Sequence, residues 1–268
     1  MNDAFLPANE DGGQDDVMKI EGKVFLFEQP ELLNARDHGN LGIKAPDSLY
    51  SFAANQKALP VLITEFPSAT RDYPVIFTNP TNPAPLVAVG LGAEKNLYVD
   101  DQGRWDEFRY IPAYLRRYPF AIATTQGANQ FGVVIDRKSD YVTDDPEIPF
   151  FENGQMSERI KKMTEFLSAF EQDRRRTETF CKKLVELELL APQQATYTPE
   201  GGGDPIVIAE YTAVNETKLK ELPDDVLVDL AKTNILPMIY AHLLSLNHWP
   251  LLYARAQKAL GASPAGSA

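Results

Sequence analysis

The densest group of residues able to do chemistry lies in one segment, residues 105–120, with the sequence WDEFRYIPAYLRRYPF. Arginine and aromatic side chains alternate in it: Trp105, Arg109, Tyr110, Tyr114, Arg116 and Arg117. Guanidinium groups beside aromatic rings can bind a carboxylate or a phosphate through two parallel hydrogen bonds. The segment therefore predicts a binding surface for an anionic small molecule, a peptide or a protein partner. In the alternative reading, the arginines pair with the chain's own carboxylates and the rings cover a sheet edge.

A second candidate is Arg174, because it interrupts an apolar seam. Apolar or small residues recur at steps of three and four, and this spacing predicts a helix over 157–187: Ile160, Met163, Leu167, Phe170, Thr177, Cys181 and Leu184. Arg174 stands where the next seam residue is due. A charge there extends to solvent, meets a buried acid of the chain, or contacts a ligand or partner. We expect the seam to cover the chain's own sheet, with a homodimer through this helix as the alternative.

The three histidines do not form a metal-site pattern. His242 and His248 are six residues apart, which places them on nearly opposite faces of a continuous helix. His242 lies on an apolar stripe, where we expect a core histidine and keep ligand binding or catalysis as the alternative. The single cysteine, Cys181, rules out an internal disulfide and a site of several thiolates. We predict no metal, no cofactor and no catalytic residue.

The elements that position these residues are short strands followed by helices. Apolar runs rich in β-branched residues and bounded by Pro, Asn or Gly predict strands over 24–27, 60–66, 74–78, 85–89, 96–99, 120–123 and 131–135. Their short connections favour hairpins and an antiparallel sheet. Behind the 157–187 helix, the sequence predicts a hairpin near 195–212. Capping residues and prolines then predict helices over 224–231 and 234–246, and a last one that opens at Pro250.

The predicted fold class is α+β, with an N-terminal, mostly antiparallel β-sheet region packed against a long helix and a C-terminal helical bundle. Along the chain we expect a disordered acidic arm over 1–16, a β-rich region over 17–150, a helical region over 151–260 and a disordered tail over 261–268. Both ends are poor in bulky residues, so neither can bury enough surface to order itself. The part from about 20 to 260 is expected to form one integrated domain.

Composition limits the classes of partner. The 268 residues carry 38 acidic and 26 basic side chains, which gives a net charge of −12. This acidity argues against binding to nucleic acid or to an anionic membrane surface, since both require clustered Lys and Arg. The start lacks the features of a signal peptide, and the most apolar stretch, 235–246, falls short of the roughly 20 residues of a membrane-spanning helix. We expect a cytoplasmic protein that does not insert in a membrane, with signal-independent export as the alternative.

Several segments resemble the SapC family of bacterial proteins. They are PVLITEF (60–66), YPVIF (73–77), LVAVGL (86–91), EKNLY (94–98), RYIPAYLRRYPF (109–120), FCKKL (180–184), LLAP (189–192) and IYAHLLSL (239–246). The resemblance spans about residues 49–252. It implies an association with bacterial surface-layer proteins and with genes for outer-membrane receptors and flavin-dependent halogenases. It implies no catalytic residues.

The expected function is that of a non-enzymatic binding or accessory protein, linked to bacterial surface-layer or outer-membrane uptake systems. The Arg/Tyr segment, together with Arg174 and His242, would form its ligand or partner surface. One alternative is a tailoring enzyme for peptide or carbohydrate substrates, with Tyr114, His242 and nearby carboxylates as acid and base. Another is a structural surface-layer component that assembles through the long helix.

Overall fold

The structure is a computed structural model and describes residues 24–92, 95–124, 131–199 and 202–261. The predicted arm over 1–16 lies outside the described residues, as does all of the predicted tail except Gly261. The chain divides into two compact units, and each unit is assembled from two separate segments. The first unit combines the chain up to Leu49 with Arg116–Gln172. The second combines Tyr50–Leu115 with the chain from Asp173 onward.

The first unit is built from small antiparallel sheets. One has the strand order β1-β7-β6, and its strands are β1 (Pro30–Leu32), β6 (Phe120–Thr124) and β7 (Phe131–Asp136). Another has the order β8-β2-β9, with β2 (Gly42–Ile43), β8 (Val142–Thr143) and β9 (Ile148–Pro149). The short helix α1 (Ala35–His38) and the hairpin of β10 (Phe151–Glu152) and β11 (Gln155–Met156) complete this unit's regular elements before the long helix.

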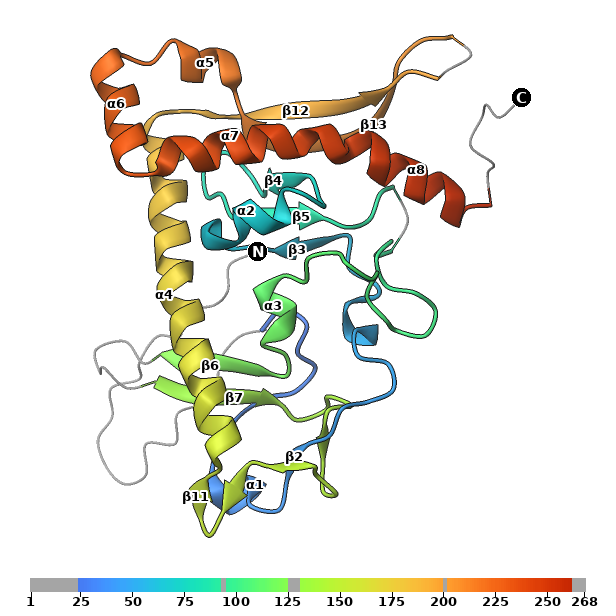
Figure 1. The fold of residues 1–268 in the computed structure, drawn as a ribbon, viewed down its shortest axis with the longest axis vertical. Helices are drawn as coiled ribbons and strands as arrows, with labels where there is room; N and C mark the ends of the chain where they lie inside the picture. The colour runs from blue at the N-terminus through green and yellow to red at the C-terminus, as the bar shows by residue number, and fades with distance from the viewer. Residues whose placement is uncertain (1–23, 93–94, 125–130, 200–201, 262–268) are drawn as a thin grey trace. The chain divides into compact units, whose positions relative to one another are not determined.

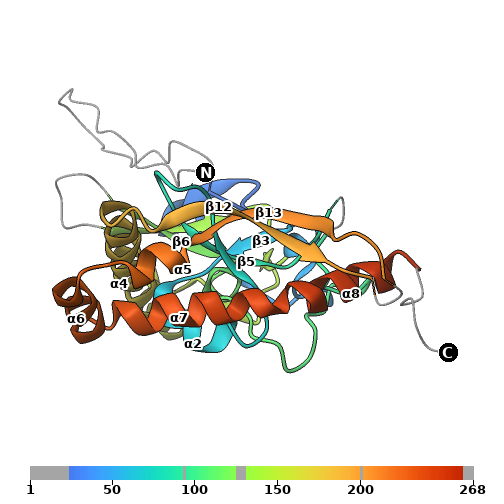
Figure 2. The ribbon, with the colours of Figure 1, turned by 90° about the horizontal axis from the view of Figure 1, so that it is seen from above.

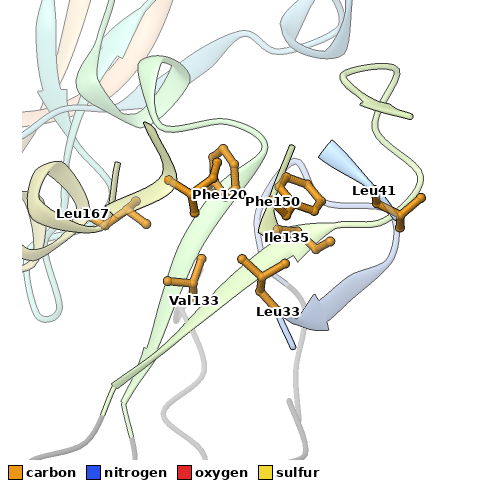
Figure 3. Packing of buried hydrophobic residues seen from close by; sticks show 8 residues of the cluster. Leu33, Leu41, Phe120, Val133, Ile135, Phe150 and Leu167 are labelled. Carbon is orange, nitrogen blue, oxygen red and sulfur yellow. The ribbon is translucent and has the colours of Figure 1, made fainter. Parts of the chain in front are cut away.

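The core of the first unit is one cluster of buried apolar side chains, most of which are labelled in Figure 3: Leu33, Leu41, Phe120, Val133, Ile135, Phe150, Ile160 and Leu167. They come from strands, from loops and from the start of the long helix. The rings of Phe120 and Phe150 meet edge to face, with 5.9 Å between their centroids, a geometry that favours aromatic pairs beyond the area that they bury.

The second unit contains a five-stranded antiparallel sheet with the order β12-β13-β4-β5-β3. Its strands are β3 (Ala58–Pro60), β4 (Val75–Phe77), β5 (Pro85–Ala88), β12 (Leu190–Tyr197) and β13 (Ile206–Val214). The hairpin of β12 and β13 confirms the one predicted near 195–212.

The second unit also contains helical elements (Figure 1). Before the long helix come the turns η1 (Ser51–Ala53) and η2 (Ile63–Glu65), with α2 (Phe66–Ala69) and α3 (Ala113–Arg116), whose last residue belongs to the first unit. After the hairpin come α5 (Glu216–Lys220), α6 (Asp224–Lys232), α7 (Ile235–Ser245), η3 (Leu246–His248) and α8 (Trp249–Ala259). The last three run along the β12–β13 hairpin, since Trp249 stacks near Tyr211 and Tyr253 near Tyr197. The observed helices and antiparallel sheets confirm the α+β class.

The long helix α4 (Glu158–Glu186) confirms the helix predicted from the seam. Six of the seven apolar or small seam residues are buried, and Met163 packs partly buried against the core cluster. In the second unit the Phe180 ring contacts Phe66 edge to face, and the Thr177 hydroxyl accepts a hydrogen bond from the Ile63 amide at 3.0 Å. Most of the seam is therefore packed within the chain.

Three predicted strands are wrong. Residues 96–99 form no strand: Leu97 and Tyr98 lie in a turn, and Val99 makes an isolated antiparallel bridge to Trp105. Residues 24–27 form a turn, closed by a hydrogen bond from the Phe27 amide to the Val24 carbonyl. The next two amides, of residues 28 and 29, donate to the Asp136 carboxylate rather than to a strand. In the run 60–66 the strand ends at Pro60, and the Glu65 carboxylate accepts a hydrogen bond from the Leu62 amide. That local bond favours a helical turn over a sheet ladder.

Candidate functional site

The division between the two units falls inside the predicted Arg/Tyr segment, between Leu115 and Arg116. Its two parts are therefore described separately. Trp105 belongs to the second unit and is buried. Its ring packs against Tyr50, Tyr73 and Tyr98, with centroid distances of 5.8, 6.5 and 6.1 Å. Trp105 is thus an interior aromatic that supports the loop that follows it.

Arg109 lies at the surface and pairs with two acids of its own unit. Its guanidinium donates to the Asp72 carboxylate at 3.0 Å and approaches Asp106 at 3.9 Å. The hydrogen-bonded Asp72 carboxylate raises the pKa of Arg109, because it stabilises the charged form. The Arg109 side chain nevertheless stays 41% exposed, whereas that of Asp72 is 9% exposed. Part of this guanidinium can still be reached from solvent.

Tyr110 is held by acids at both its ends. Its amide donates to Asp72 at 2.8 Å, and its hydroxyl donates to the Glu65 carboxylate at 2.8 Å. Glu65 is buried, and the same carboxylate oxygen also accepts the Ala113 amide at 2.6 Å, at the start of α3. Tyr110 and Glu65 therefore fix the path of the chain into α3.

Arg255 of α8 joins the same region, which the sequence did not reveal. Its guanidinium lies 2.7 Å from Asp106 and stacks over the Tyr98 ring, with 4.4 Å to the centroid. Asp106 thus lies between the guanidinium groups of Arg109 and Arg255. Burial raises the pKa of Tyr98, so this ring stays neutral beneath the cation.

Phe108 is the exposed tip of this loop. Its side chain is 99% exposed, and its backbone has φ = 63°, in the left-handed region that a bulky residue rarely adopts. The chain is anchored on both sides of it. The Asp106 amide donates to the Tyr98 carbonyl at 2.8 Å, and the Arg109 amide donates to the Asp106 carbonyl at 3.3 Å. We call Asp106, Phe108, Arg109 and Arg255 the Phe108 surface.

The remaining predicted residues of the segment have other surroundings. Tyr114 is buried in the second unit, in α3. In the first unit, Arg116 is exposed and lies over the Phe166 ring, with 5.7 Å to the centroid. Arg117 is buried and lies over the Phe170 ring at 4.5 Å. These arginines cover aromatic rings of α4, as cation–π pairs do.

Arg174 pairs with Glu178, one turn further along α4. This acid lies on the same helix as Arg174. Such a pair is a common arrangement on a helix surface and contributes little to stability.

His242 is fully buried in the second unit. Its Nδ1 donates to the Val75 carbonyl at 2.8 Å, and its Nε2 accepts the Val214 amide at 3.1 Å. These bonds connect α7 to β4 and β13 through a neutral ring, which also contacts Phe77. Burial lowers its pKa from 6.5 to about 4. His242 is therefore a core residue, and it is not positioned to contact a ligand or to act as acid and base with Tyr114.

Cys181 and the acids offer no assembled centre in the part of the chain that is described. Cys181 is buried in α4, and burial raises the pKa of its thiol to about 12, which suppresses the reactive thiolate. Among the described residues no three His, Cys, Asp or Glu side chains come together as a metal site would require. Nor does any helix there have the length and apolar character needed to cross a bilayer.

The fold and the Phe108 surface define an α+β protein that uses most of its predicted site residues internally and exposes the anchored side chain of Phe108. The chain belongs to the SapC family, since the family model described as SapC matches residues 33–252. This match covers most of the chain and confirms the resemblance found in the sequence. Comparison with curated proteins gave no match, and comparison with solved structures gave none either.

Proposed function

We propose that this SapC family chain is a non-enzymatic binding or accessory protein, linked to bacterial surface-layer or outer-membrane uptake systems, and that the Phe108 surface contacts a protein partner. The observation that carries the proposal is Phe108. A left-handed backbone conformation destabilises a bulky L-residue by about 1–2 kcal/mol. Because the ring is exposed, burial of its apolar surface does not offset this cost. A residue that costs stability at an anchored position is expected to act in recognition.

The surroundings of Phe108 fit the composition of a protein interface. An aromatic anchor with arginine beside it is the residue combination enriched where binding energy concentrates. Arg109 and Arg255 keep 41% and 31% of their side-chain areas exposed, so carboxylates of a partner can still approach these two arginines. We therefore expect the partner to present an apolar pocket bordered by acidic side chains.

The non-enzymatic reading is supported by the use that the fold makes of its reactive groups. Both His242 nitrogens bind backbone groups, Tyr114 is buried, and the Cys181 thiol is buried within α4. Each of them stabilises the fold where it lies. A tailoring enzyme that used Tyr114 and His242 would need both on a substrate-accessible surface.

The test places a photoreactive benzoyl-phenylalanine at position 108 and irradiates cells that produce the full chain. We expect a discrete covalent adduct with one protein, and no such adduct when the same residue replaces Val207, an exposed apolar residue of β13. The Phe108→Gly variant should fold normally and fail to co-purify that same protein, while Val207→Thr should retain it. Equal adducts from both positions, or an undiminished yield with Phe108→Gly, would refute the proposal.

A further inference from the structure

The helices at the end of the second unit form one rod with an exposed apolar face. Figures 1 and 2 show α7 and α8 following one another almost in line, with η3 between them. The inner face of the rod is buried against its own unit, and its members include Ile239, His242, Ser245, Trp249, Leu252 and Ala256. The rod is thus fixed by one side only.

The opposite face carries a regular stripe, which we call the outer stripe. Its exposed members recur at alternating steps of three and four: Pro237, Tyr240, Leu244, Asn247, Leu251, Ala254 and Lys258. Leu244 and Leu251 are 66% and 61% exposed, and Tyr240 is 41% exposed. The outward face of a surface helix is ordinarily polar or charged. A stripe with this spacing is instead the pattern by which two helices pack along each other.

The distribution of acidic residues along the chain indicates which partner covers the outer stripe. The chain has 38 acids, yet its last is Asp229, and residues 230–268 contain none. With a net charge of −12, two copies repel each other over most of their surface. The residues of the rod itself contribute no carboxylate to such a contact. Just before it, α6 carries Asp224, Asp225 and Asp229, whereas the far end of the rod carries Lys258.

We propose that the protein forms a homodimer in which the outer stripes of two copies pack antiparallel. In this register Leu244 faces the partner's Asn247, and Tyr240 faces the partner's Leu251. The antiparallel direction brings the acids of α6 towards the partner's Lys258. A parallel pair would instead place like charges together at both ends. The outer stripe contains no residue of the Phe108 surface, although Arg255 of that surface also lies in α8.

The first test is sedimentation equilibrium of the full chain at about 1 to 100 µM, a range that detects micromolar dissociation constants. We expect a dimer for the wild type. Leu244→Glu should raise the dissociation constant at least about 30-fold, as expected when a central contact of an interface is lost. The matched control is Val207→Glu, which places the same charge at an exposed apolar residue of β13, outside the outer stripe, and should leave the dimer intact. Circular dichroism verifies that both variants are folded.

The second test decides direction and register by disulfide formation. Positions 240 and 251 are 11 residues apart, or about 16 Å along a helix, too far for a bond within one chain. Tyr240→Cys with Leu251→Cys in the same chain should oxidise to a covalent dimer, whereas each single variant should stay monomeric on a denaturing gel. Crosslinking by either single variant would indicate a parallel pair and overturn the proposal.

A wild type that sediments as a monomer throughout the concentration range would also overturn it. In that case vesicles of phosphatidylcholine and phosphatidylglycerol identify the other chemistry that an apolar stripe can serve. Cosedimentation of the wild type with vesicles, lost in Leu244→Glu and kept in Val207→Glu, would assign the outer stripe to a lipid surface.

Discussion

His242 makes the stability of the second unit depend on pH in a way that can be calculated. Its pKa is about 4 in the folded protein, against 6.5 for an unperturbed histidine. Protonation would place a hydrogen on Nε2, which faces the amide hydrogen of Val214. The folded state therefore resists a proton that the unfolded chain accepts. The stability that depends on neutral His242 is present above pH 6.5 and is lost as the pH falls towards 4.

The magnitude follows from linkage between protonation and folding. For a pKa of 6.5 unfolded and about 4 folded, the free energy of unfolding falls by about 2 kcal/mol between pH 7 and pH 5, and by about 3 kcal/mol in total. The comparison variant is His242→Gln, since its amide offers a donor and an acceptor but does not titrate. Carboxylates titrate in both proteins, so their contribution cancels in the difference.

The assay is urea denaturation of wild type and His242→Gln at pH 7, 6 and 5. We expect the wild type to lose about 2 kcal/mol more than the variant over this interval. Ile239→Ala, which removes a buried side chain less than one turn away, controls for destabilisation alone and should lose stability in parallel with the wild type. Parallel curves for wild type and His242→Gln would refute the assignment of His242 as a buried neutral histidine.

Three further outcomes are expected. Phe108→Gly should raise the free energy of unfolding by about 1 kcal/mol, measured by urea denaturation, because glycine adopts positive φ without strain; an unchanged or lower value would contradict the backbone argument. Asp136→Asn should lower it by about 2–3 kcal/mol, because the buried carboxylate accepts hydrogen bonds from three amides and the Tyr118 hydroxyl, and Asp140→Asn, an exposed neighbour, serves as control. Cys181 should react with a thiol reagent at pH 8 more than about 100-fold more slowly in the folded than in the unfolded protein, and rapid labelling of the folded chain would contradict its burial.

Periodic patterns in the sequence predicted the helices well. The seam of α4, the Asp224 start of α6 and Pro250 near the start of α8 each carry a local signal that the structure uses. The strand predicted over 60–66 was wrong because the prediction followed the β-branched residues of this run. It took no account of Glu65, whose carboxylate caps a turn. Local capping is decided by a hydrogen bond, which composition alone does not reveal.

The surroundings of the candidate site were harder to predict. Asp72 is one of 38 acids, and no sequence spacing relates it to Arg109, whereas Asp106 lies three residues before Arg109. Only the folded chain brings Arg255 to Asp106, across about 150 residues of sequence. The exposure of Phe108 could not be predicted from the sequence, because an aromatic residue among arginines and tyrosines is equally compatible with a buried position in the core. The sequence thus indicated the segment, while long-range packing decided which of its side chains reach solvent.

The interleaved segments of the two units have a consequence for biosynthesis. Neither unit is complete until a late part of the chain has left the ribosome, since the first needs residues as far as Gln172 and the second continues beyond Asp173. The early strands β3, β4 and β5 must therefore wait for β13 and α7, with apolar faces such as that of Phe77 temporarily uncovered. The nascent chain is then expected to fold late in synthesis, with both units forming at nearly the same time. A truncation made at any single internal point would leave partial products that chaperones and proteases recognise.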